Sequence, residues 1–185
     1  MMTCFTRVVV VLGFARNALA TQQIPPNQIL IGLALFVTFF VMGPVWKQVN
    51  DSALQPYLAG QIGEEQALEE AAEPVRQFML RQTREKDLAL FLSFAGIKTP
   101  VRPETIPLQV LIPAFAISEL KTAFQIGFFI FVPFIVIDLV VASTLMSMGM
   151  LMLPPMMISL PFKVLLFVMV DGWHLVVRSL VLGFR

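Results

Sequence analysis

The chain has 185 residues, of which 57% are hydrophobic and 14% are charged, and its net charge is +1. A soluble domain typically carries about 25% charged residues, so a chain of this length is expected to form one domain whose surroundings are largely lipid or other apolar helices. The near-neutral charge gives no basis for electrostatic binding of nucleic acid, and a single cysteine, Cys4, excludes an internal disulfide and a cysteine-based metal cluster.

The chain opens with a short apolar run at residues 8–14 between Arg7 and Arg16. A membrane span needs about 20 residues, so this run is short for one. One interpretation is a signal peptide, with Arg7 ahead of the apolar run and the sequence ALA at 18–20 as a cleavage site. The other is the interior of a longer hydrophobic helix whose upstream half precedes Met1. Composition alone does not choose between them.

An uncharged stretch at residues 29–46 predicts a helix long enough to cross a bilayer. The connector before it, TQQIPPNQ, contains tandem prolines, which cannot continue a helix. Residues 50–105 then hold nine of the twelve acidic residues. Helices are predicted at about 64–73 and 74–95, with Pro74 at the start of the second. We expect this polar segment to form a compact, water-facing subdomain.

Two further apolar regions complete the chain. The first, at residues 122–153, exceeds one span; Pro133 is expected to kink it, and Gly149 with the prolines at 154–155 to end it. The second runs over residues 156–184, and Pro161 suits its first turn. The prediction is an all-α fold of membrane-type helical hairpins. Its segments are hydrophobic helices at 1–49, the polar subdomain at 50–105 and a hydrophobic hairpin with a methionine-rich loop at 106–185.

Four ionisable residues lie in or beside the apolar regions: Glu119, Asp138, Lys163 and Asp171. Asp138 and Asp171 are expected to be buried charges. A charge at the centre of an apolar helix costs roughly 2.5–3.5 kcal/mol on insertion scales. Each charge therefore either reaches the membrane surface along its own side chain or pairs between helices or between subunits. On one continuous helix, the spacing would place Lys163, Asp171 and Arg178 on a single face.

No pattern in the sequence is typical of catalysis. His174, the only histidine, lies beside Trp173 in an apolar helix, where a histidine is more often packed than catalytic. The chain has no histidine, cysteine and carboxylate cluster at metal-ligand spacing, no glycine-rich phosphate loop and no nucleophile motif. We therefore expect no enzyme activity and no cofactor.

Methionines concentrate in the stretch LMSMGMLMLPPMM, and four of them alternate with other residues, at Met146, Met148, Met150 and Met152. Methionine commonly fills irregular gaps in a core, so core packing at a hairpin tip is one interpretation. Alternating positions do not stay on one face of a helix. The spacing therefore also suits a loop or distorted turn before the tandem prolines.

Several long motifs resemble the FliP family of bacterial flagellar export-gate proteins. They are IPAFAISELKTAFQIGF, PFIVIDLVVAS, MSMGMLMLPP, ISLPFKVLLFVMVDGW and RQTREKDLALF, and the resemblance covers essentially the whole chain. SELKTAFQIGF and QTREKDLALF favour the flagellar branch over the related virulence-secretion (injectisome) subunit. The resemblance also identifies residues 1–28 as the interior of the family's first hydrophobic helix with its connector. It implies a truncated first helix, and ALA at 18–20 is then no cleavage site.

The resemblance implies a function in protein export across the bacterial inner membrane. About five copies of such a subunit assemble with FliQ and FliR into a closed, right-handed helical ring, beside FlhA and FlhB. The proton-motive force drives unfolded rod, hook and filament proteins through it. The subunit is not an enzyme and has no cofactor. It is a multi-pass membrane protein of the flagellar basal body, its helical hairpins lie partly above the membrane plane, and residues 50–105 are periplasmic.

The resemblance also assigns roles to particular residues. Glu119 and Lys163 form a salt bridge between neighbouring subunits. A methionine-rich loop seals the pore; here it comprises Met146, Met148, Met150, Leu151 and Met152, with Leu151 where many relatives have a further methionine. A competing hypothesis is a proton-coupled transporter of small solutes that uses Glu119, Asp138 and Asp171 as a relay. The absence of an internal inverted repeat argues against that hypothesis.

Overall fold

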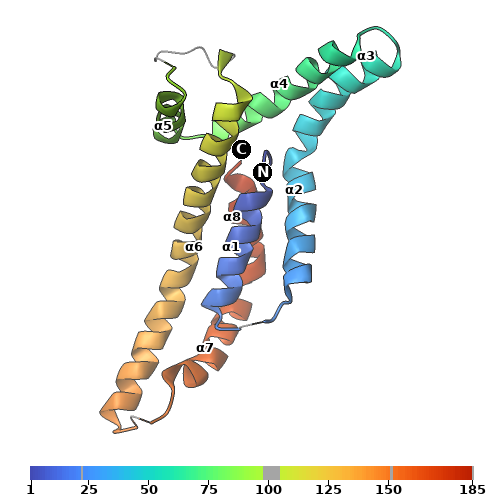
Figure 1. The fold of residues 1–185 in the computed structure, drawn as a ribbon. Helices are drawn as coiled ribbons and strands as arrows, with labels where there is room; N and C mark the ends of the chain where they lie inside the picture. The colour runs from blue at the N-terminus through green and yellow to red at the C-terminus, as the bar shows by residue number, and fades with distance from the viewer. Residues whose placement is uncertain (22, 98–104, 151, 185) are drawn as a thin grey trace. The chain divides into compact units, whose positions relative to one another are not determined.

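The computed structural model describes residues 1–21, 23–97, 105–150 and 152–184, and it is 81% helical with no strand in those ranges. This confirms the predicted all-α fold (Figure 1). The helices are α1 (Phe5–Ala18), α2 (Asn27–Val49), the π-helical segment η1 (Asn50–Leu54), α3 (Gln55–Leu58), α4 (Glu64–Gln82), α5 (Glu85–Phe94), α6 (Leu108–Ser147), α7 (Pro155–Met169) and α8 (Gly172–Leu182).

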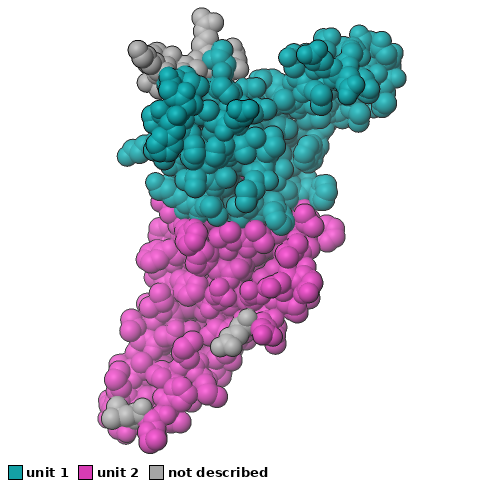
Figure 2. Space-filling view, viewed as in Figure 1, with its two compact units in different colours: residues 1–7, 38–122 teal, residues 8–37, 123–185 magenta. Residues whose placement is uncertain are grey.

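The helices group into two compact units (Figure 2). Unit 1 consists of Met1–Arg7 and Thr38–Thr122, so it contains the polar segment together with parts of its flanking helices. Its core packs residues of α4, α5 and α6 together. The ring centroids of Phe78 and Phe115 lie 6.0 Å apart. The buried members of this core are Met79, Leu92, Ile106, Val110, Leu111 and Phe115.

Helix α4 differs from the prediction at Pro74. The structure carries the helix through Pro74 and ends it at Gln82, where Thr83 and Arg84 adopt extended backbone angles. A proline inside a helix removes one backbone hydrogen bond and disfavours continuation, but packing of the helix against the core overrides this local signal. The break after Gln82 is held by a hydrogen bond of 2.7 Å from the Thr83 hydroxyl to the Met79 carbonyl.

Unit 2 consists of Val8–Val37 and Ala123–Arg185. Its core contains Ala18, Leu19, Phe134 and Phe167, with Trp173 packed against it. Helix α1 packs closely against α6 at Gly127. A Cβ atom at that position would lie 2.5 Å from the Phe14 ring. Only glycine therefore lets α1 and α6 approach this closely.

Helix α6 is longer than the predicted span. It has 40 residues, begins at Leu108 and continues through Pro133 to Ser147. Its end is confirmed: Gly149 adopts a φ of +74° in the turn that follows. Pro154 caps α7 and Pro155 occupies its first turn. Pro161 lies inside α7, beyond its first turn, so the prediction that it belongs to the first turn was wrong; Pro155 already occupies that turn.

The region at 156–184 is two helices, not one. Helix α7 ends at Met169, α8 begins at Gly172, and their axes bend by 61°. Asp171 has a φ of +51° at the break. A Cβ atom at Gly172 would lie 2.3 Å from the Phe167 ring, so this ring packs directly on the backbone of the bend. The prediction that Lys163, Asp171 and Arg178 share one helical face was therefore wrong.

Within the described residues, two continuous helices are long and apolar enough to cross a membrane: residues Asn27–Leu58, which include α2, η1 and α3, and α6. The bent pair α7 and α8 raises the number to three if it forms one span. Only 28% of the apolar window in the first and 11% in α6 is buried within the chain. Most of their apolar surface thus remains available to lipid or to other helices.

Candidate functional site

A buried ion pair joins α1 to α6 in unit 1. The Arg7 Nη2 group donates to Glu119 Oε1, and the side chains are 3% and 0% exposed. The same nitrogen donates to Gln82 Oε1 at 3.0 Å. Arg7 therefore binds the end of α4 and the middle of α6 at once. The sequence marked Arg7 only as a residue flanking an apolar run, because its partner lies 112 positions away.

The Glu119 carboxylate depends on this single cation among the described residues. Its second oxygen, Oε2, is buried and has no hydrogen-bond partner there. Taking a carboxylate out of water is costly unless it is paired. Removing one partner of a buried pair costs about 3–5 kcal/mol, because the other charge is left uncompensated. Arg7 is thus the residue on which burial of Glu119 relies.

A second polar cluster fixes the corner between α4 and α5 against α6. The Ser118 hydroxyl donates to Asp87 Oδ2 at 2.7 Å and accepts from the Arg84 amide at 3.0 Å. The Arg84 guanidinium also donates to Thr122 Oγ1 at 3.3 Å. Asp87 belongs to the segment predicted to face water, so its role in this cluster was not predicted. Its place in the first turn of α5 was the available signal, since helix N-termini favour carboxylates.

In unit 2, a third cluster joins α6 to α7. Lys163 Nζ lies 2.6 Å from Asp138 Oδ2, and the Ser159 hydroxyl donates to Asp138 Oδ1 at 2.5 Å. Lys163 is buried, whereas Asp138 keeps 34% of its side chain exposed. Ser159 was not predicted; it lies one helical turn before Lys163, which places both on one face of α7. The cluster fixes the two helices of the hairpin in register.

The structure pairs Glu119 and Lys163 with other residues, each inside its own unit. They belong to different units, and each already has an oppositely charged partner, Arg7 and Asp138 respectively. The predicted bridge joins neighbouring subunits, so it stays a prediction. The expected burial of Asp171 does not hold within the single chain. At the helix break its side chain is 77% exposed, with Oδ2 3.6 Å from Nδ1 of His174.

The methionine-rich turn follows α6. Met146 lies in the last turn of α6, while Met148, Met150 and Met152 lie in the turn between α6 and α7. All four side chains are exposed in the single chain, and Met152 is 97% exposed. Leu151 lies outside the described residues. Three of the four alternating methionines thus occupy the turn and the first lies at the end of α6, and the seal remains a prediction.

Cys4 lies buried just before α1, and burial raises the pKa of its thiol from 9.0 to about 11. Only the thiolate reacts readily with maleimides, so labelling of the folded chain is expected to be slow near neutral pH and to accelerate as the pH rises toward that pKa. The unfolded thiol ionises first, so the folded state loses relative stability above about pH 9. Cys4 is therefore a natural reporter of local opening beside Arg7.

We predict that Arg7→Met speeds maleimide labelling of Cys4 by roughly a hundredfold, the equivalent of about 3 kcal/mol. The physical reason is the uncompensated Glu119 carboxylate. The double variant Arg7→Met with Glu119→Gln removes that charge and should recover most of the protection. The control is Arg81→Met, because Arg81 is exposed on α4. Equal labelling of Arg7→Met and Arg81→Met would contradict this role of Arg7.

Similarity to known proteins covers nearly the whole chain, including the three polar clusters. A sequence model of the FliP family matches residues 1–180. The flagellar biosynthetic protein FliP of Bacillus subtilis is 60% identical over 184 residues, which cover 100% of this chain and 83% of the relative. The protein of the same name from Pectobacterium carotovorum is also 60% identical, with 100% and 71% covered. That of Aquifex aeolicus is 52% identical, with 100% and 78% covered. The chain belongs to the FliP family of flagellar biosynthetic proteins.

Proposed function

We propose that this chain is a pore-forming core subunit of the flagellar type III protein export gate, which passes unfolded rod, hook and filament proteins. The observation that carries the proposal is the 60% identity to flagellar biosynthetic proteins over essentially the whole chain. The family model spans the positions of the paired charges and of the methionine-rich turn. The subunit acts without catalysis, as one wall of a conduit.

The exposed apolar helices support an assembly in the bacterial inner membrane. Most of the apolar surface of α6 is not buried by the chain itself. In the proposed gate, about five copies cover part of this surface together with FliQ and FliR. FlhA and FlhB are further partners, and residues 50–105 face the periplasm. The subunit is then a multi-pass protein of the flagellar basal body.

The ion pairs favour a structural subunit over a proton relay. Each of the three proposed relay carboxylates lies beside a basic group of its own: Glu119 beside Arg7, Asp138 beside Lys163, and Asp171 beside His174. A relay instead needs groups that exchange protons with one another or with water. An injectisome export-gate subunit is a nearer alternative than a transporter. The flagellar function is favoured over it because the relatives named above are all flagellar.

The test of the function is a chimera. Residues 1–185 replace the matching segment of FliP in Bacillus subtilis, at the native locus, so that the relative's own flanking sequence is retained. We expect swimming motility and secretion of hook and filament proteins, because the segment is 60% identical to the one it replaces. A chimera that is made in normal amounts, yet neither swims nor secretes these proteins, would contradict the proposal.

In the same chimera, the methionine-rich turn is proposed to seal the pore against ions. We predict that replacing Met150, Leu151 and Met152 by alanine leaves assembly intact but lowers the membrane potential during export. The reason is that flexible thioethers fill an irregular gap that alanine leaves open. The control is Met156→Ala with Met157→Ala, which removes two exposed methionines at the start of α7. An unchanged potential in the triple variant would leave plain packing as the role of the turn.

The proposed bridge between subunits competes with pairs inside the chain. We predict that Glu119→Lys and Lys163→Glu each block ring assembly, and that combining them restores part of it, as judged on native gels. If the pairs inside the chain decide instead, Asp138→Lys will rescue Lys163→Glu, and Arg7→Glu will rescue Glu119→Lys. Rescue by those internal swaps alone would refute the bridge between subunits.

A further inference from the structure

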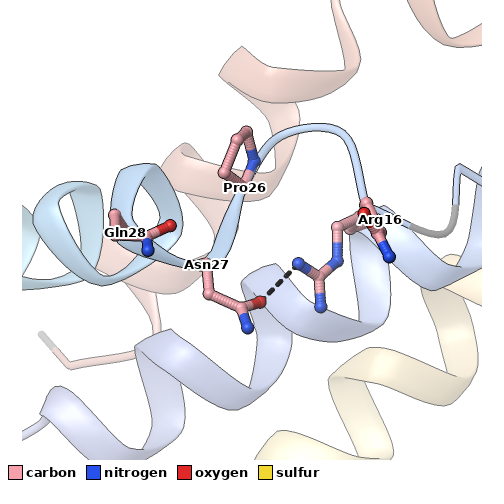
Figure 3. Close-up of a pocket in the computed structure, with 5 residues that line it drawn as sticks. Arg16, Pro26, Asn27 and Gln28 are labelled. Carbon is pink, nitrogen blue, oxygen red and sulfur yellow. Dashed lines mark hydrogen bonds between the residues drawn. The ribbon is translucent and has the colours of Figure 1, made fainter.

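A polar cavity lies at the connector between α1 and α2, within unit 2. It has a volume of about 420 Å³ and is lined by Arg16, Gln23, Pro26, Asn27 and Gln28. Figure 3 shows the Arg16 guanidinium and the Asn27 side chain pointing toward each other across the connector. A cavity lined by a cation and amide groups is unusual in a chain of such apolar composition.

The positive charge of Arg16 has no carboxylate partner in the described part of the chain. Nη1 donates to Asn27 Oδ1 at 2.6 Å and to the Pro25 carbonyl at 3.3 Å, and both acceptors are neutral. Nε is buried and lacks a hydrogen-bond partner among the described residues. A guanidinium presents donors in a fork that matches the oxygens of a carboxylate or phosphate. Arg16 thus has unused capacity for an anion.

No acidic residue of the same unit is available to supply that anion. The first 50 residues contain no Asp or Glu. The two acids that unit 2 does contain, Asp138 and Asp171, lie beside Lys163 and His174. No carboxylate side chain of this unit therefore neutralises the charge of Arg16.

The start of α2 adds to the positive potential of the cavity. The first amide groups of a helix have no partner within it, and the helix dipole places partial positive charge at this end. Asn27 and Gln28, the first two residues of α2, both line the cavity. Their side-chain amides supply further donors beside Arg16.

The surface beside the cavity is apolar. Ile29 and Ile31, in the first turns of α2, are 59% and 44% exposed. Helix α2 begins one of the two stretches able to span a membrane. An anion that carries hydrocarbon chains would therefore place its charge at Arg16 and its chains along α2. A free inorganic anion would leave this apolar surface uncovered.

We propose that the cavity binds the phosphate headgroup of an anionic phospholipid, with Arg16 as its principal contact. The Arg16 guanidinium binds the phosphate oxygens, Asn27 and Gln28 donate from their amides, and the acyl chains lie on the exposed face of α2. The site fixes the α1–α2 connector at the level of the headgroups. This assignment does not depend on the proposed export function, because it concerns binding by the folded chain alone.

The test compares lipid retention by the purified 185-residue chain in detergent, using native mass spectrometry. The probes are phosphatidylglycerol, phosphatidylcholine and inorganic phosphate. We expect phosphatidylglycerol to be retained in preference, and Arg16→Gln to weaken its binding about fivefold, the effect of one basic residue near an anionic surface. The matched control is Arg178→Gln, since Arg178 is exposed and lines a mainly apolar groove in the same unit.

A second variant separates binding from folding. Asn27→Asp gives Arg16 a carboxylate within reach, so it should keep or raise the melting temperature while it weakens retention of phosphatidylglycerol at least as much as Arg16→Gln does. A purely structural Arg16 would leave lipid retention unchanged in both variants and overturn the proposal. If Arg16→Gln and Arg178→Gln lost phosphatidylglycerol to the same extent, the site would be overturned, because net charge alone would then account for the binding. If inorganic phosphate were retained as well as phosphatidylglycerol, the lipid assignment would be overturned.

Discussion

A charged side chain buried among apolar helices must pair with an opposite charge, and this constraint governs how the helices of this protein can pack. Desolvation of a carboxylate or an ammonium group is expensive in a medium of low polarity. Arg7 with Glu119 and Lys163 with Asp138 meet that requirement in units 1 and 2 respectively. A buried pair adds little net stability, because its attraction is largely offset by desolvation, yet separating its members is costly. Such pairs therefore restrict which helix arrangements are possible more than they strengthen any one of them.

The two ion pairs join different helices: one joins the hairpin helices α6 and α7, and the other joins α1 to α6. Between α6 and α7 the Asp138 cluster sets the register of a hairpin whose turn is short and rich in methionine, and aromatic contacts such as Phe134 with Phe167 fill the space around it. In unit 1 the Arg7 pair connects α1 with α6, while the Ser118 and Asp87 hydrogen bond holds the corner of α4 and α5. Polar contacts thus set the position of each helix, and apolar contacts fill the interfaces.

Large apolar surfaces around these ion pairs are not buried by the chain itself. Phe36 and Phe129 are 77% and 74% exposed on the two helices able to span a membrane. Lipid and neighbouring helices are the two natural partners of such a surface. The polar cavity at Arg16 adjoins one such surface, since Ile29 and Ile31 are exposed in the first turns of α2.

The sequence by itself determined the fold class, the apolar regions, the polar segment and the end of α6, because each has a local signal: unbroken hydrophobicity, clustered acids, or Gly149 followed by prolines. It also carried the family, through motifs read residue by residue. Only the tertiary structure decided that α4 passes through Pro74, that the chain bends at Asp171 where Phe167 packs on Gly172, and that Arg7 is the partner of Glu119. These features depend on contacts outside the short stretch of sequence from which each local pattern is taken. A proline or an arginine has the same local signature whether or not a distant helix compensates it, so no pattern along the chain could distinguish the cases.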